Sequence, residues 1–263
     1  MLKLLVPENQ GIFKIAAETF ASLWHDVTGE TPLVVTEKDE NSPLVVFGAD
    51  FMNPFVHEKI MAGMIGGFRL RSGSDDYHLL SAADENGRQL LFLGAGRRRS
   101  LLYAVYRFFE LRADCRYFWD EDRIPKRANL DLSGLDLAES PRFQYRGIRY
   151  FAHRGLKRFQ AEHWDFEDWK KEIDWLLLRI GIDDLFQKAF PYIVPYPETN
   201  RRNTSKHPRS YDDRTQFHSL EYRGELRRKI LAYARERDLM HPEDCGTMTH
   251  WYSRTPPEFL DVV

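Results

Sequence analysis

Short, continuous apolar runs that alternate with helical patterns constrain the fold of this chain most. Two such runs, "PLVVT" at 32–36 and "PLVVFGAD" at 43–50, have the length of strands and are bounded by glycine, proline and acidic residues. A third run covers residues 3–7, and apolar residues at helical spacing follow it from Ile12 to Trp24. Strand-length runs with a helix between them predict a compact α/β domain.

Further patterns extend this domain to about residue 130. Asn9 is the expected cap of the first helix. The segments "YHLLSA" and "QLLFLGAG" flank the turn-like "ADENGR", which predicts a β-hairpin over residues 77–96. From Ser100 onward, apolar residues at helical spacing form one face of a second amphipathic helix. We therefore expect residues 1–130 to be a compact α/β domain with a small sheet and two helices.

A polar stretch separates this domain from the rest of the chain. Residues 120–141 have no helical period and carry prolines near both ends, so we interpret 131–141 as a linker. Beyond it, strand-like segments alternate with two helical patterns, one of which is expected to begin at Asp165. The expected strands are "YRGIRYF", "GIDDLFQ" and part of "DLMHPEDCGTMTHW". This order predicts parallel βαβ units, and the long loops after the strands favour a (β/α)8 barrel.

The length of the second part sets a limit on that barrel. A complete barrel takes about 250 residues, and residues 142–263 suffice only for its first three βα units. We therefore expect a barrel that is truncated within this chain. Because an incomplete barrel leaves strand edges uncovered, the same interpretation predicts self-association through the open edge.

Composition excludes several functional classes. Apolar residues make up 43% and charged residues 30% of the chain, as in a globular protein. A formal charge of −2 argues against nucleic-acid binding by phosphate neutralisation. No window approaches the 18 or so apolar residues of a membrane span, and "MLKLLVPENQG" lacks the features of a secretory signal. With only two cysteines, expected to be reduced thiols, the chain is predicted to be cytoplasmic and not membrane-bound.

Two motifs resemble ligand sites without matching them. The turn "GAGRRRS" at 94–100 lacks the third glycine of a dinucleotide fingerprint, so we interpret it as a basic surface turn with Arg97–Arg99 solvated. The segment "HPEDCGTMTH" at 241–250 contains metal-ligand residue types at a spacing that fits no zinc site. We expect neither a metal nor a cofactor. The adjacent Asp183 and Asp184 would point to opposite faces of a strand, so they cannot flank one bond.

The stretch "SPRFQYRGIRYFAHRG" at 140–155 resembles the start of the catalytic barrel in family 20 β-N-acetylhexosaminidases. The resemblance implies that Arg146 corresponds to the arginine that binds sugar hydroxyls there. "GAGRRRSLLYAVYRFFE" looks like the last helix of the non-catalytic domain that precedes such barrels, which implies that residues 1–130 are an N-terminal non-catalytic α/β domain. In the third-strand segment, His250 takes the place of the family's Pro-Gly-His histidine, but the Pro-Gly is absent.

A second resemblance concerns the helix that follows. "HWDFEDWKKEIDWLLLRIGID" is similar to the first barrel helix of family 89 α-N-acetylglucosaminidases, and family 67 α-glucuronidases share the small α/β domain before a barrel. These resemblances imply a glycoside hydrolase acting on N-acetylhexosaminides or uronides. In family 20 the catalytic acids lie on the fourth strand, which this chain does not contain, so no catalytic residue is assigned. The alternative is a non-catalytic carbohydrate-binding or interaction module.

Barrel sites form at the carboxyl ends of the strands. The substrate-binding residues expected there are His153 and Arg154 after the first strand, Gln187 with Lys188 after the second, and His250 with Trp251 after the third. Arg146 lies near the start of its strand, so only the resemblance places it in the site. The other interpretation of Arg146 is a buried ion pair with an acidic residue of the second strand. The aromatic content of 14% suits either sugar stacking or a large core.

Overall fold

The computed structural model describes residues 1–37, 42–118, 121–142, 164–179 and 220–238. The chain divides into two compact units, which are described separately below. The first comprises Met1–Gln144 with Glu236–Asp238, and the second comprises Tyr145–Arg235 with Leu239–Val263. The α/β class is confirmed. The expected barrel strands fall outside the described residues, so the truncated barrel stays a prediction.

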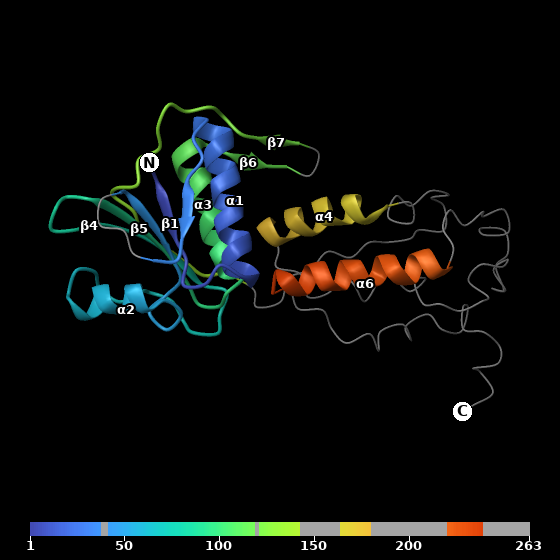
Figure 1. Cartoon of the computed structure of the whole chain (residues 1–263), viewed down its shortest axis with the longest axis horizontal. Helices are drawn as coiled ribbons and strands as arrows, with labels where there is room; N and C mark the ends of the chain where they lie inside the picture. The colour runs from blue at the N-terminus through green and yellow to red at the C-terminus, as the bar shows by residue number, and fades with distance from the viewer. Residues whose placement is uncertain (38–41, 119–120, 143–163, 180–219, 239–263) are drawn as a thin grey trace. The chain divides into compact units, whose positions relative to one another are not determined.

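A six-stranded, mostly parallel sheet forms the centre of the first unit (Figure 1). Its order is β2 (Leu33–Val35), β1 (Lys3–Leu5), β3 (Leu44–Phe47), β5 (Gln89–Ala95), β4 (Tyr77–Ala83) and β8 (Asp136–Glu139). β1 is parallel to β2 and β3, and β3 is parallel to β5; β4 is antiparallel to β5 and β8. All four residues of β3 are buried, as expected for a central strand covered on both faces.

Two helices, α1 (Gly11–Thr28) and α3 (Ser100–Ala113), pack on one face of the sheet (Figure 1). The Phe20 ring stacks on Trp24 and Phe108 and contacts Phe47 of β3 edge-on. These contacts confirm the apolar faces predicted for both helices. The expected cap at Asn9 is wrong: the N-cap of α1 is Gln10, and its side chain makes no capping hydrogen bond.

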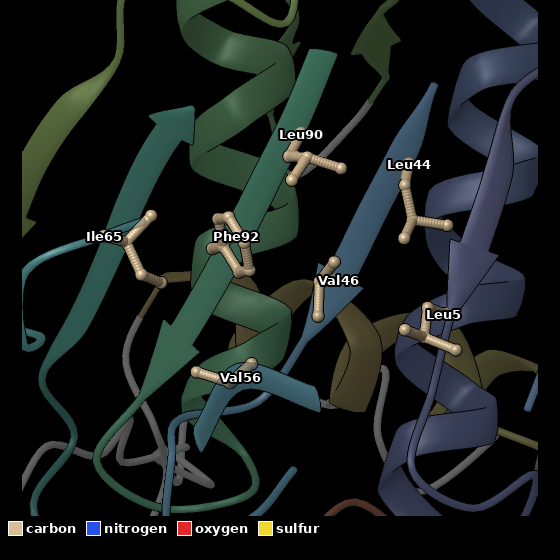
Figure 2. Packing of buried hydrophobic residues seen from close by; sticks show 7 residues of the cluster. All are labelled: Leu5, Leu44, Val46, Val56, Ile65, Leu90 and Phe92. Atoms are coloured by element: carbon tan, nitrogen blue, oxygen red, sulfur yellow. The ribbon is translucent and has the colours of Figure 1, made fainter. Parts of the chain in front are cut away.

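The short helix α2 (Pro54–Met61) covers the opposite face of the sheet. Val56 of α2 and Ile65 beyond it pack against sheet residues Leu5, Leu44, Val46, Leu90 and Phe92 (Figure 2). Asn53 caps α2 by accepting a hydrogen bond from the Phe55 amide at 3.0 Å, and Pro54 occupies the first helical position. The sequence interpretation did not include this helix.

Part of the expected linker belongs to the sheet. Residues 136–139 form β8, the edge strand beside β4, with Leu137 opposite Leu79. Just before it, Leu130 and Leu132 are buried. The first unit therefore extends past residue 130. A separate two-stranded ribbon, β6 (Arg116–Tyr117) and β7 (Asp122–Arg123), lies between α3 and this segment in the sequence.

In the second unit, α4 (Phe166–Arg179) and α6 (Leu220–Glu236) lie side by side (Figure 1). Tyr233 of α6 joins them: its hydroxyl donates to the Asp174 carboxylate at 2.7 Å, and its ring lies 5.8 Å from that of Phe166. The predicted start of α4 is confirmed, because the Asp165 carboxylate accepts hydrogen bonds from the backbone amides of Glu167 and Asp168. None of the helices in the described ranges has the length and apolarity needed to cross a membrane.

Candidate functional site

The six residues predicted to bind substrate lie outside the described residues. They are Arg146, His153, Arg154, Gln187, His250 and Trp251. The same holds for Lys188, Asp183, Asp184 and the 241–250 segment. Their roles therefore stay predictions. Within the described part of the chain, polar and charged side chains gather instead around residues 67–76, a segment that we call the strap.

The strap packs directly on the turn between β5 and α3. The Gly73 amide donates to the Gly96 carbonyl at 2.7 Å, and the Gly96 amide donates to the Asp76 carbonyl at 2.8 Å. A Cβ atom at Gly96 would lie 2.4 Å from the Arg71 carbonyl oxygen and 2.7 Å from that of Ser74. The glycine is therefore required for close backbone approach. Because the strap fills the space at this turn, the turn does not form the open cradle that binds phosphates.

Arg99 is buried, which corrects the expectation that Arg97–Arg99 are solvated. Its side chain is 1% exposed and donates two hydrogen bonds to the Asp75 carboxylate, at 2.8 and 2.9 Å. Arg97 donates to the Gly73 carbonyl, and only Arg98 projects well into solvent. Burial of the Arg99 guanidinium is tolerated because the Asp75 carboxylate neutralises it through a bidentate ion pair.

A second ion pair lies within the strap itself. The Arg71 side chain donates to both oxygens of Asp76, at 2.9 and 3.0 Å, and the Arg71 amide donates to the same carboxylate. The hydrogen bond from the Arg71 side chain is the main reason that the pKa of Asp76 lies well below its usual value. This carboxylate therefore stays ionised at neutral pH and holds the Arg71 and Asp76 parts of the strap together.

His78 and Asp136 connect the strap to the edge strand. The His78 ring is buried on β4, and its Nε2 lies 2.7 Å from Oδ1 of Asp136 on β8. The Arg69 guanidinium also binds Asp136, at 2.8 Å, while the Arg69 backbone amide donates to Nδ1 of His78 at 3.2 Å. The hydrogen bond from His78 is the largest influence that lowers the pKa of Asp136. The arrangement is an aspartate–histidine pair whose second ring nitrogen is occupied by a backbone amide.

A matching cluster lies on the other face of β8. Glu139 accepts hydrogen bonds from the Tyr77 hydroxyl and from Arg107 of α3, and Arg107 also binds Glu110. Burial is the main cause of the raised pKa of Tyr77, so its hydroxyl remains protonated and acts as a donor. Charged side chains thus hold β8 in place on both of its faces.

The chemistry of these clusters is that of a scaffold. Each carboxylate of these clusters (Asp75, Asp76, Asp136, Glu139 and Glu110) accepts hydrogen bonds from an arginine, a histidine or a tyrosine of the same unit. Burial raises the pKa of the Cys115 thiol to about 11, so this thiol is not a reactive thiolate at neutral pH. Across the described ranges, no group of three or more histidine, cysteine or acidic residues could hold a metal ion.

Comparisons with known proteins give little guidance. No family model matches the chain, and no curated protein matches it. Among solved structures, it is similar to a family GH115 4-O-methyl-α-glucuronidase with specificity for decorated arabinogalactans, with 15% identity and a TM-score of 0.47. That match covers 70% of this chain and spans 24% of the glucuronidase. At this score the likeness establishes neither a shared fold nor a shared activity.

Proposed function

We propose that this chain is the N-terminal portion of a glycoside hydrolase that acts on N-acetylhexosaminides or uronides. The first unit is the non-catalytic α/β domain, and the barrel begins after it. Residues of the second unit, led by Arg146, bind the hydroxyls of the sugar, and no catalytic acid is assigned to residues 1–263.

One observation carries the proposal. The main segment of the first unit ends at Gln144, and the sequence that resembles the start of a family 20 barrel spans this boundary, with its Pro-Arg-Phe lead-in at 141–143. The element before the boundary is β8, the edge strand of a small α/β sheet, as expected of a domain that precedes such a barrel. The charged groups of the clusters described in the first unit pair with one another, which favours a structural rather than a catalytic role for that unit.

The second unit contributes a further argument. α4 carries the pattern that resembles the first barrel helix of family 89, and it lies against α6, the next described helix. Neighbouring helices that follow one another in the chain are expected on the outside of a (β/α)8 barrel.

Sugar binding tests the proposal directly. We expect the 263-residue chain to bind N-acetylglucosamine or glucuronic acid in calorimetric titrations, and Arg146→Ala to weaken binding about tenfold or more, because hydrogen bonds from a charged donor are lost. Arg98→Ala is the matched control, since Arg98 is a solvent-exposed arginine of the first unit. Equal affinities for Arg146→Ala and the unaltered chain would contradict the assigned role of Arg146.

Hydrolysis distinguishes the two functional classes. The longest product of the same gene in its source cells should hydrolyse chromogenic N-acetylhexosaminides or uronides, whereas the 263-residue chain should not. Turnover by the 263-residue chain would show that the catalytic acids lie within it. Binding without turnover by the longest product would favour the non-catalytic carbohydrate-binding module instead.

A further inference from the structure

Phe68 and Arg69, near the start of the strap, contact the sheet separately from the residues that pack on the turn between β5 and α3. Phe68 occupies the space above Gly94 of β5, where a Cβ atom would lie 2.7 Å from the Phe68 ring. The same ring contacts His78 edge-on at 5.6 Å and Phe92 at 6.5 Å. Phe68 therefore closes the apolar layer over this part of the sheet, next to Gly66 and Gly67, whose missing side chains leave the backbone free to reorient.

The hydrogen bonds of His78 define its protonation state. Since a backbone amide can only donate, the bond from the Arg69 amide requires an unprotonated Nδ1. The proton of the neutral ring is then on Nε2, where it is donated to Asp136 at 2.7 Å. His78 is thus held as one neutral tautomer, and one of its two contacts holds the strap.

Of the elements that pack on His78, β8 and the strap carry charged groups. Asp136 of β8 faces Nε2, and the guanidinium of Arg69 binds the other side of the same carboxylate. β5 contributes Gly94 opposite His78, which has no charge, and the strap adds the internally paired Arg71 and Asp76. Among the described residues, the carboxylate that contacts the ring is therefore also bound by a cation.

We propose that His78 is a proton-sensitive catch for the strap: a proton taken up from solvent by Nδ1 removes the acceptor of the Arg69 amide and loosens the attachment of Phe68 and Arg69 to β4, while the Arg69 guanidinium stays on Asp136. Histidine is the side chain whose charge ordinarily changes between about pH 5 and 8. In the imidazolium form both ring nitrogens are donors, so Nδ1–H and the Arg69 N–H oppose each other. This inference is independent of the proposed function.

Amide exchange in the 263-residue chain tests the catch. We expect the protection of the Arg69 amide, corrected for intrinsic exchange, to fall about five- to tenfold between pH 7.5 and pH 5, the effect of losing one hydrogen bond. The Gly96 amide, which donates to the Asp76 carbonyl, is the internal reference and should change much less. Unchanged protection of Arg69 over this range would overturn the proposal.

Substitutions separate the catch from a general effect of acid. His78→Asn keeps an acceptor near Nδ1 and His78→Gln keeps a donor near Nε2, but neither side chain titrates, so both variants should lose the pH response of the Arg69 amide. His57→Asn alters an exposed histidine on α2 and should retain the response. A response that persists in the His78 variants would overturn the proposal.

Ring nitrogen shifts in the unaltered chain provide a test that needs no variant. At pH 7.5 the nitrogen-15 spectrum should show the Nε2–H tautomer of His78, and its protonation should follow the same pH curve as the Arg69 amide exchange. An Nδ1–H tautomer at pH 7.5 would overturn the proposal even if the His78 variants did not fold.

Discussion

At the scale of single residues, the buried pair of Arg99 and Asp75 makes the clearest stability prediction. Arg99→Met should lower the free energy of unfolding by about 3 kcal/mol, because it leaves a buried carboxylate without its main partner. Arg98→Met is the control, because Arg98 is the neighbouring residue in the sequence and its side chain is exposed to solvent; it should change the free energy of unfolding by less than about 0.5 kcal/mol. Urea denaturation followed by circular dichroism measures both. The double variant Asp75→Leu/Arg99→Met should be more stable than Arg99→Met alone, and a less stable double variant would contradict this account.

Asp76 is predicted to contribute to the acid sensitivity of the fold. Its pKa is lower in the folded than in the unfolded state, so its stabilisation is present above about pH 4 and is lost as the pH falls through the folded value. Asp76→Asn should therefore be less stable than the unaltered chain at pH 7, and its stability should fall less steeply below pH 4. Denaturation midpoints between pH 2 and 7 measure this slope. Asp50→Asn, at an exposed position, is the control and should leave the slope unchanged.

At the scale of elements, the fit of the strap to the turn between β5 and α3 depends on one glycine. Gly96→Ala should cost about 1–3 kcal/mol of unfolding free energy, because its Cβ would collide with backbone carbonyl oxygens that cannot move independently. Gly67→Ala is the matched control: no atom lies within 4 Å of its added Cβ, and its backbone is not left-handed. We expect a change near zero or a slight stabilisation for the control. Equal losses in thermal melts of the two variants would show that close approach is not the cause.

The same scale explains which elements could be predicted from the sequence. α1 and α3 carry apolar residues over three or more turns, so their periodicity was informative. α2 has only eight residues, although Asn53-Pro54 is a recognisable helix start. β8 could not be predicted, because it has only four residues, of which two are charged, and its side chains bind residues about 60 positions earlier.

The candidate site shows a similar limit. Three consecutive arginines at 97–99 are alike in sequence, and the burial of Arg99 depends on the position of Asp75, 24 residues earlier. Periodicity within the turn contains no information about that contact. The predicted sugar-binding residues rest on resemblance and on an expected strand order, both of which concern the second unit, so they stay predictions.

At the scale of the whole molecule, the position of the domain boundary can be tested by truncation. The sequence interpretation ends the first domain at residue 130, whereas the compact unit continues to Gln144 and includes Leu132 and β8. A fragment of residues 1–142 should unfold cooperatively, because nearly all of the buried residues of the first unit lie within it. A fragment of residues 1–130 should melt at a lower temperature or not cooperatively.

The physical reason is that the shorter fragment loses both backbone pairing and charge neutralisation. Without β8, the outer edge of β4 is open to pairing with another chain, and buried His78 loses the carboxylate of Asp136. Thermal melts and sedimentation of the two fragments measure stability and association together. Equal melting temperatures would mean that β8 adds little to the fold and that residues 131–141 behave as the expected linker. A lower melting temperature with association for the shorter fragment would make β8 the strand that completes the first unit.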